Sequence, residues 1–204
     1  DKAISMDPKN YDRLIEIYEA LADYGYREVG QEYLQNVLNT DKKLDAYDSG
    51  RIYYYLGDYQ KAYLALEEAK GKGGVDSYLY LGKAYAATGD YNYASSVYSN
   101  YLSKQGPDAE IYNQLGLCEL AKKDYQKALE AFQAGKQIEG NSLMQTLSFN
   151  EIVAYEYLQD YQKAAVLLKA YLQNYPDDQT AIREQQFLVE EQSSAFCRNC
   201  RSSI

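Results

Sequence analysis

Two cysteines near the C-terminus have a spacing that could do chemistry. Cys197-Arg198-Asn199-Cys200 has the C-x-x-C pattern of a zinc half-site or of a redox pair. A structural zinc site needs four ligands, and the sequence holds three Cys and no His. We therefore favour a pair of thiols in a solvated tail, and a zinc ion that bridges two chains stays open as an alternative. Cys118 lies among apolar residues of an expected helix, where we expect a small core residue.

The remaining candidates for catalysis have simpler explanations. Glu67-Glu68 and Glu190-Glu191 are paired carboxylates, but adjacent residues on a helix point in different directions. The glycine-rich residues 70–74 lack the Lys-Ser/Thr ending and the preceding strand of a phosphate-binding loop. Without His, the commonest general base and the commonest metal ligand are both missing. We therefore predict that the chain is not an enzyme and binds no cofactor and no metal.

Charge and hydropathy limit the classes of partner. The chain has 21 Lys and Arg against 30 Asp and Glu, a net charge of -9, and a polyanion binder normally shows a basic face. Nucleic acid is therefore not an expected partner. No apolar run approaches the roughly 20 residues that cross a bilayer, and no signal peptide is visible. The sequence starts at Asp1 without Met, so the compartment stays open: cytoplasm, or cell envelope if an anchor or signal precedes Asp1.

A short segment recurs four times along the chain. Residues 57–62 read GDYQKA, residues 89–94 GDYNYA, residues 123–128 KDYQKA and residues 159–164 QDYQKA. Their tyrosines are separated by 32, 34 and 36 residues, and a weaker copy lies at 24–28. Self-similarity with such a period is the signature of a repeat architecture.

Each copy lies between two helical patterns. Before the second copy, Tyr78, Leu81, Gly82 and Tyr85 follow the i, i+3, i+4, i+7 spacing of one helix face. The Gly-Asp pair then supplies a helix stop and an acidic N-cap for the next helix. Each unit is therefore predicted to be a helix, a tight turn and an antiparallel helix, and such units bury their apolar faces by stacking.

These units resemble the tetratricopeptide repeat (TPR) family. The family pattern is an aromatic residue, Leu-Gly, Tyr, then Ala, an aromatic residue and a closing Pro. The matching positions are Tyr78, Leu81, Gly82, Tyr85, Ala94 and Tyr98 in one unit, Tyr112, Leu115, Gly116, Ala128 and Phe132 in the next, and Ala164, Leu168 and Pro176 in the last. The resemblance implies an all-α fold, a right-handed superhelical array of antiparallel helix hairpins, that is, an α-α solenoid.

The array is expected to cover residues 1–192. Five repeats are predicted at 11–40, 43–74, 75–108, 109–144 and 145–178. Residues 1–10 resemble the end of a preceding repeat, with a short N-terminal capping turn as the alternative. Residues 179–192 are predicted to be a capping helix, with Ile182, Gln186 and Phe187 or Val189 facing inward. Residues 193–204 are predicted to be disordered.

Small residues are expected where the two helices of a hairpin meet. Gly50, Gly82 and Gly116 occupy this place in three repeats. The first repeat has Tyr18 near this place and the fifth has Ile152. We therefore expect wider or shifted helix contacts in those two repeats.

The resemblance also implies a binding groove, because the first helix of each hairpin lines the concave side in this family. The residues carried over to that groove are Tyr47, Arg51, Tyr54, Tyr55, Tyr80, Lys83, Asn113, Gln114 and Asn150. One family branch grips a C-terminal carboxylate with a cluster of Lys, Arg and Asn. The full cluster is not present here, so we predict no chaperone-tail clamp. Many of the 25 tyrosines at helical spacing are expected to be packing residues.

The predicted function is a protein-protein interaction module that binds a peptide or protein in this groove. The alternative is a structural or self-associating subunit of a larger assembly, including one at a cell envelope, so a homo-oligomer stays open. A regulatory module of a larger enzyme is a third class. A TPR scaffold by itself does not choose among biological processes.

Overall fold

The computed structural model describes residues 10–41, 44–70 and 74–188, and within these ranges every regular element is a helix. The chain divides into two compact units, Asp1–Val97 and Tyr98–Ile204, each of which is described by itself. The partial repeat predicted at 1–10 falls almost wholly outside the described residues. The tail predicted at 193–204, with Cys197 and Cys200, also lies outside them.

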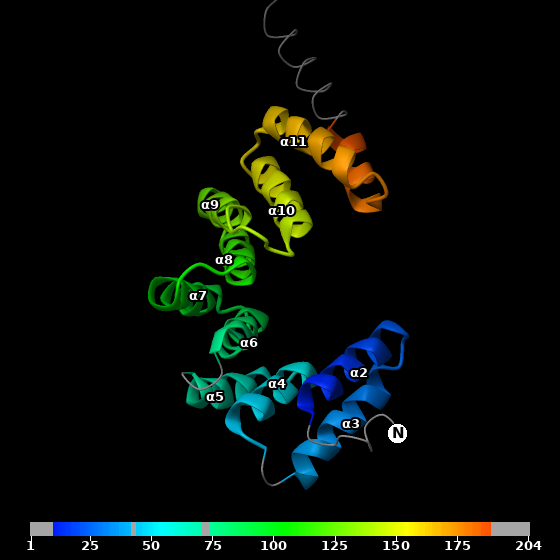
Figure 1. Cartoon of the computed structure of the whole chain (residues 1–204), viewed down its shortest axis with the longest axis vertical. Helices are drawn as coiled ribbons and strands as arrows, with labels where there is room; N and C mark the ends of the chain where they lie inside the picture. The colour runs from blue at the N-terminus through cyan, green and yellow to red at the C-terminus, as the bar shows by residue number, and fades with distance from the viewer. Residues whose placement is uncertain (1–9, 42–43, 71–73, 189–204) are drawn as a thin grey trace, which may run out of the picture. The chain divides into compact units, whose positions relative to one another are not determined.

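The first unit is built from helical hairpins. Its helices are α2 (Tyr11–Asp23), α3 (Arg27–Thr40), α4 (Ala46–Leu56), α5 (Tyr59–Ala69) and α6 (Gly74–Ala87). Helix α2 packs on α3, and α4 packs on α5, as neighbours joined by a short turn (Figure 1). Each hairpin also contacts the next, through α3 with α4 and through α5 with α6.

The second unit repeats this arrangement. Helix α7 (Tyr91–Gln105) starts in the first unit and continues into the second. It is followed by α8 (Ala109–Ala121), α9 (Tyr125–Lys136), α10 (Met144–Tyr157) and α11 (Tyr161–Asn174). The hairpins are α8 with α9 and α10 with α11, and α9 packs on α10. Together the hairpins form the α-α solenoid fold that the repeats predict.

The repeated tight turns have the predicted conformation. Gly57 ends α4 in the left-handed region at φ 80°, and the Asp58 carboxylate accepts a hydrogen bond of 3.2 Å from the backbone N–H of Lys61. Asp124 and Asp160 make the same bond to the third residue after them, at 3.3 Å and 3.0 Å. Each aspartate satisfies one of the free N–H groups at the start of the second helix.

Close contacts inside the hairpins depend on glycine. A Cβ atom at Gly50 would lie 2.6 Å from Cγ of Leu66, and one at Gly116 would overlap the ring of Phe132. In the first hairpin the two helices approach as closely, but the large residue lies on the first helix and the glycine on the second. Tyr18 is buried on the first helix and faces Gly30 on the second, where a Cβ would lie 2.8 Å from Cδ2 of Tyr18. The large residue thus requires no wider contact in this hairpin.

The helix at residues 179–188 turns a different face inward than predicted. Ala181 and Leu188 are buried against Ile152 of α10 and Leu168 of α11. Phe187 is 43% exposed and Gln186 is exposed, so the prediction that these two residues face inward is wrong. Ile182 is half-buried, and Val189, the alternative to Phe187, lies outside the described residues. The inward face carries Ala181 in place of the predicted Ile182 and Leu188 in place of the predicted Phe187. Within the described ranges, no helix is long and apolar enough to cross a membrane.

Candidate functional site

The nine predicted groove residues form two groups, one in each unit. All nine lie on the first helices of hairpins or on α6, which follows the second hairpin. The first unit holds Tyr47, Arg51, Tyr54 and Tyr55 on α4 with Tyr80 and Lys83 on α6, and the second holds Asn113 and Gln114 on α8 with Asn150 on α10. The contacts within each group are described below.

Tyrosine rings form the centre of the group in the first unit. Tyr54, Tyr55 and Tyr80 contact one another, with ring centroids 5.4 Å, 5.7 Å and 6.0 Å apart. Two of these pairs meet edge to face, the arrangement that aromatic quadrupoles favour by about 0.5–1.5 kcal/mol. All three rings are half-buried, so each combines packing with an accessible surface. We name these three residues the tyrosine cluster.

Hydrogen bonds hold the hydroxyl groups of Tyr55 and Tyr80 in the tyrosine cluster. The Tyr55 hydroxyl donates to Oε1 of Glu19 on α2 at 2.6 Å and lies 3.1 Å from the Tyr80 hydroxyl. Burial, followed by the hydrogen bond to Glu19, raises the pKa of Tyr55 above its ordinary value. Burial also raises the pKa of Tyr54. The phenols of Tyr54 and Tyr55 are therefore neutral at physiological pH.

Arg51 is an internal brace in this structure. Its side chain is buried, and one guanidinium nitrogen lies 2.5 Å from Oδ1 of Asp12 on α2 and 3.5 Å from Oδ1 of Asp48. The guanidinium also lies over the rings of Tyr47 and Tyr80, at 5.0 Å and 5.3 Å from their centroids. Arg51 thereby connects α2, α4 and α6 and orders two of the predicted groove rings. Its partner Asp12 was not identified from the sequence, because no local pattern links residues so far apart.

The second unit presents an amide pair between neighbouring hairpins. Asn150 donates from Nδ2 to Oδ1 of Asn113 at 2.9 Å, which joins α10 to α8. Asn113 is buried, and Asn150 is half-buried. Gln114 donates from Nε2 to Oε1 of Glu110 on its own helix at 3.0 Å. An amide has two donors and two acceptor lone pairs, so these side chains keep hydrogen-bonding capacity beyond the bonds described.

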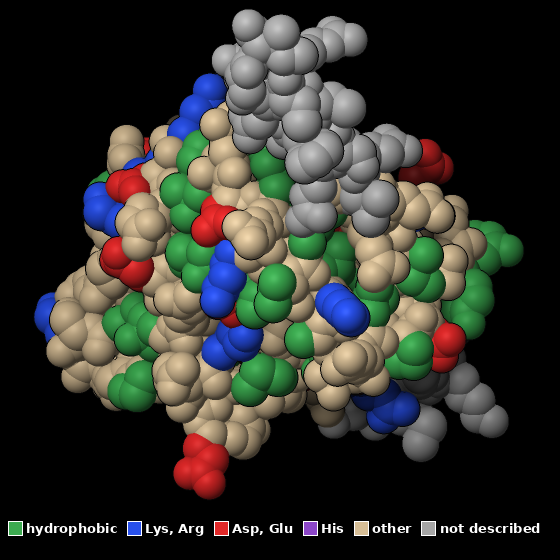
Figure 2. Space-filling model, turned by 90° about the horizontal axis from the view of Figure 1, so that it is seen from above, with side chains coloured by type: hydrophobic (Ala, Val, Ile, Leu, Met, Phe, Trp, Pro, Cys, Tyr) green, Lys and Arg blue, Asp and Glu red, His purple; other side chains and the backbone are tan. Residues whose placement is uncertain are grey.

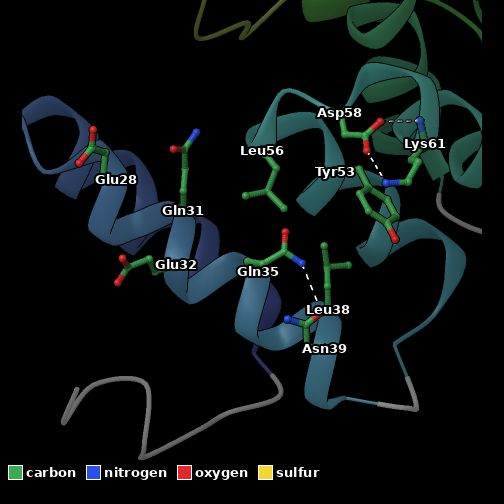
Figure 3. Close-up of a pocket in the computed structure, with 10 residues that line it drawn as sticks. All are labelled: Glu28, Gln31, Glu32, Gln35, Leu38, Asn39, Tyr53, Leu56, Asp58 and Lys61. Carbon is green, nitrogen blue, oxygen red and sulfur yellow. Dashed lines mark hydrogen bonds and ion pairs between the residues drawn. The ribbon is translucent and has the colours of Figure 1, made fainter.

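A cavity in the first unit lies away from the predicted groove residues. It has a volume of about 830 Å³ and is bounded by α3, the end of α4 and the start of α5. Figure 3 shows Glu28, Gln31, Glu32 and Gln35 along α3, with Leu56 and Tyr53 across from them. Several of its polar groups already pair internally, such as Lys61 with Asp58 at 2.6 Å. Its wide and polar lining is that of a solvated hollow between two hairpins.

Metal and thiol chemistry find no site in the described ranges. There, no three His, Cys, Asp or Glu side chains gather in a way that could hold a metal ion. Cys118 is buried, as predicted, and burial followed by the charge of Glu119 raises the pKa of its thiol to about 12. A thiol in this state is a poor nucleophile.

On the face drawn in Figure 2, acidic and basic side chains are scattered among hydrophobic and neutral ones.

Comparisons with known proteins agree with the hairpin architecture. Family models of the tetratricopeptide repeat match residues 79–142 and residues 149–178. A comparison with curated proteins gave no match. These two segments include parts of both compact units.

Solved structures of TPR proteins share the fold. One is TTC0263, a thermophilic TPR protein of Thermus thermophilus, with a TM-score of 0.67, 15% identity and coverage of 88% of this chain and 98% of that one. A second is YrrB, described as a TPR protein with an unusual peptide-binding site. Its TM-score is 0.60 and its sequence identity 21%, and the match covers 91% of this chain and 96% of that one. A third is MamA, with a TM-score of 0.64, 21% sequence identity and coverage of 72% of this chain and 81% of that one. The family models thus identify residues 79–142 and 149–178 as tetratricopeptide repeats, the repeat of a family of protein-interaction modules, and the solved structures show the same fold.

Proposed function

We propose that the first helices of the hairpins bind an extended segment of a protein partner, and that α4 and α6 of the first unit supply the main contact surface. The observation that carries the proposal is the tyrosine cluster, whose half-buried rings are held by ring contacts and by the hydrogen bond to Glu19. Such rings offer apolar contact area that loses little conformational entropy on binding. Aromatic residues are also enriched among the residues that dominate interface energies.

The amide groups of the second unit have a complementary role in the proposal. Gln114 and Asn150 lie on the corresponding helices of the second unit and are half-buried, so their amides can bond to the N–H and C=O groups of an extended backbone. Asn113 is buried and accepts a hydrogen bond from Asn150, so its role in the proposal is to hold Asn150 in place. Arg51 acts in the proposal by ordering Tyr47 and Tyr80, because its own charge is paired with Asp12. The peptide-binding site named for YrrB offers a precedent on the same fold.

The test is capture of a partner by the purified chain, followed by a binding titration with that partner. The test variant carries Tyr80→Ser and Lys83→Ala, both half-buried positions of α6. The matched control carries Tyr24→Ser and Lys169→Ala, both at exposed positions outside the predicted set. We expect the test variant to weaken binding at least about tenfold, as losing one interface hot spot does, and the control to bind normally. Equal binding by all three proteins would contradict the proposal.

A structural role is the second candidate, and one observation favours it. Leu64 on α5 and Val166 on α11 are 61% and 62% exposed, and each lies five residues after the repeated tyrosine of its hairpin. Apolar residues exposed at the same repeat position suit contacts between copies of the chain. Sedimentation of the chain with and without Leu64→Gln and Val166→Gln tests this. An oligomer that the two changes dissociate would favour the structural role, and a monomer at all concentrations would exclude self-association.

A further inference from the structure

A small cavity lies beside the tyrosine cluster, between the C-terminal ends of α2 and α4. These helices are neighbours in the first unit (Figure 1). The cavity has a volume of about 280 Å³ and is lined by Tyr18, Glu19, Ala22, Asp23, Arg27, Tyr54, Tyr55 and Tyr59. We propose that this cavity takes a Lys or Arg side chain of a protein partner. The inference rests on the proposed function and adds the chemistry of the residue that the partner presents.

Four aromatic rings line the cavity. The ring of Tyr54 lies 5.4 Å from that of Tyr55 and 5.7 Å from that of Tyr59, and Tyr55 lies 5.4 Å from the buried Tyr18. The three outer rings are half-buried, so part of each borders the cavity. Aromatic faces carry negative potential and attract cations within about 6 Å of the ring centre.

Two carboxylates at the cavity add charge of the right sign. Glu19 and Asp23 are both exposed, one helical turn apart on α2. Oε1 of Glu19 accepts the Tyr55 hydroxyl bond, and in the described part of the chain no ion pair neutralises Glu19 or Asp23. Each therefore has oxygen atoms available to a guanidinium or ammonium group.

The helix ends at the cavity do not decide the charge of the ligand. The C-terminal ends of α2 and α4, at Asp23 and Leu56, carry partial negative charge. The N-terminal ends of α3 and α5, at Arg27 and Tyr59, carry partial positive charge beside them. The preference for a cation therefore rests on the rings and on the two carboxylates.

The size of the cavity indicates one side chain. Pockets that bind whole small molecules have volumes of about 300–1,000 Å³, and this cavity lies just below that range at about 280 Å³. Of its lining residues, Arg27 alone is cationic; it is exposed, and no ion pair within the described ranges holds it. Because the Arg27 guanidinium has the same charge as the proposed Lys or Arg ligand and repels it, removing Arg27 should strengthen binding.

The test uses the full chain and two blocked peptides, Ala-Ala-Arg-Ala-Ala and the same peptide with neutral citrulline at the centre. Backbone amide shifts are followed by NMR as each peptide is added. The binding variant carries Glu19→Gln and Asp23→Asn. The matched control carries Glu16→Gln on the same helix and Asp177→Asn, both outside the cavity lining. Arg27→Gln is the variant with the opposite charge change, and amide spectra verify that each variant is folded.

We expect the arginine peptide to shift the amides around Asp23, Tyr54 and Tyr59 and to bind at least about fivefold more tightly than the citrulline peptide, about the effect of one cation–π contact. The double variant should weaken the arginine peptide about tenfold, the control should leave it unchanged, and Arg27→Gln should strengthen it. Equal binding of the two peptides, or no saturable shift by either, would overturn the inference. The proposed function is tested separately, because Tyr80 and Lys83 do not line this cavity.

Discussion

At the scale of single residues, two turns carry a backbone conformation that suits glycine. Lys123 and Gln159 have φ angles of 64° and 61°, at the places where other repeats have Gly57 and Gly89. A side chain in the left-handed region costs roughly 1–2 kcal/mol, and part of this is regained because glycine has more freedom in the unfolded chain. The turns therefore keep their shape in these repeats with less stability than glycine would give.

Replacing Gln159 by glycine is predicted to raise the free energy of unfolding by about 0.5–1 kcal/mol. Urea unfolding followed by circular dichroism measures the change. Lys169→Gly, at an exposed position in the middle of α11, is the control and should lower stability by about 1 kcal/mol, because glycine weakens a helix interior. A loss of stability in both variants would show that the turn gains nothing from glycine.

Gly116→Ala is predicted to destabilise the hairpin of α8 and α9. The added methyl group would overlap the ring of Phe132, which is fully buried. Overpacking of this kind costs about 1–3 kcal/mol. The same measurement on Ser103→Ala, an exposed position of α7, should show little change. A stability equal to the parent protein for Gly116→Ala would mean that α8 and α9 separate easily.

At the scale of the helices, the helix at residues 179–188 places Glu184 beside Glu156 of α10. Burial, followed by the charge of Glu184, raises the pKa of Glu156 to about 8. One oxygen of Glu156 is buried without a hydrogen-bond partner. Since the folded-state pKa lies above the ordinary value, the stability linked to this proton is fully present below about pH 4.5 and is lost as the pH rises through about 8.

Glu156→Gln is therefore predicted to stabilise the chain at alkaline pH and to have little effect at acidic pH. At about pH 8.5 we expect the melting temperature to rise by roughly 2–4 °C, the shift for each kcal/mol in a chain of this size. Glu139→Gln, at an exposed position, is the control and should not reproduce this pH dependence. A gain of the same size at pH 5 would contradict a role for the proton.

The helices show which features the sequence predicts and which it does not. The turns at Asp58, Asp124 and Asp160 depend on residues close together in the chain, so a short motif was enough to locate them. The ion pair of Arg51 with Asp12 depends on how one hairpin packs on the next, which no local pattern encodes. The inward face of residues 179–188 was misplaced by one residue, because Phe187 suggested burial by its type alone.

The candidate site was predictable to a similar extent. The family resemblance selected the helices that carry the tyrosine cluster, and ring contacts join Tyr54, Tyr55 and Tyr80 in the structure. Glu19 and Asp23 were not identified, because they belong to the first repeat, whose turn copy is the weakest in the chain. Their contribution depends on contacts between α2 and α4, which only the folded chain shows.

At the scale of the whole molecule, the net charge of -9 should govern association. A partner that places a cationic side chain between α2 and α4 should bind faster and more tightly at low salt, because the field of the chain attracts it. Raising the salt concentration from about 50 to 300 mM shortens the screening length and is predicted to lower the association rate more than it raises the dissociation rate. Stopped-flow binding measures both rates, and salt-independent association would contradict this.

The central claim is that partners bind on the first helices of the hairpins, and site-specific photo-crosslinking tests it most directly. A photoreactive phenylalanine analogue replaces Tyr80 in one protein and Tyr93, a 44% exposed residue on the second helix α7, in another. The account predicts a crosslinked partner from position 80 and little or none from position 93. A partner that crosslinks to position 93 and not to position 80 would contradict the account and place binding on the second helices of the hairpins.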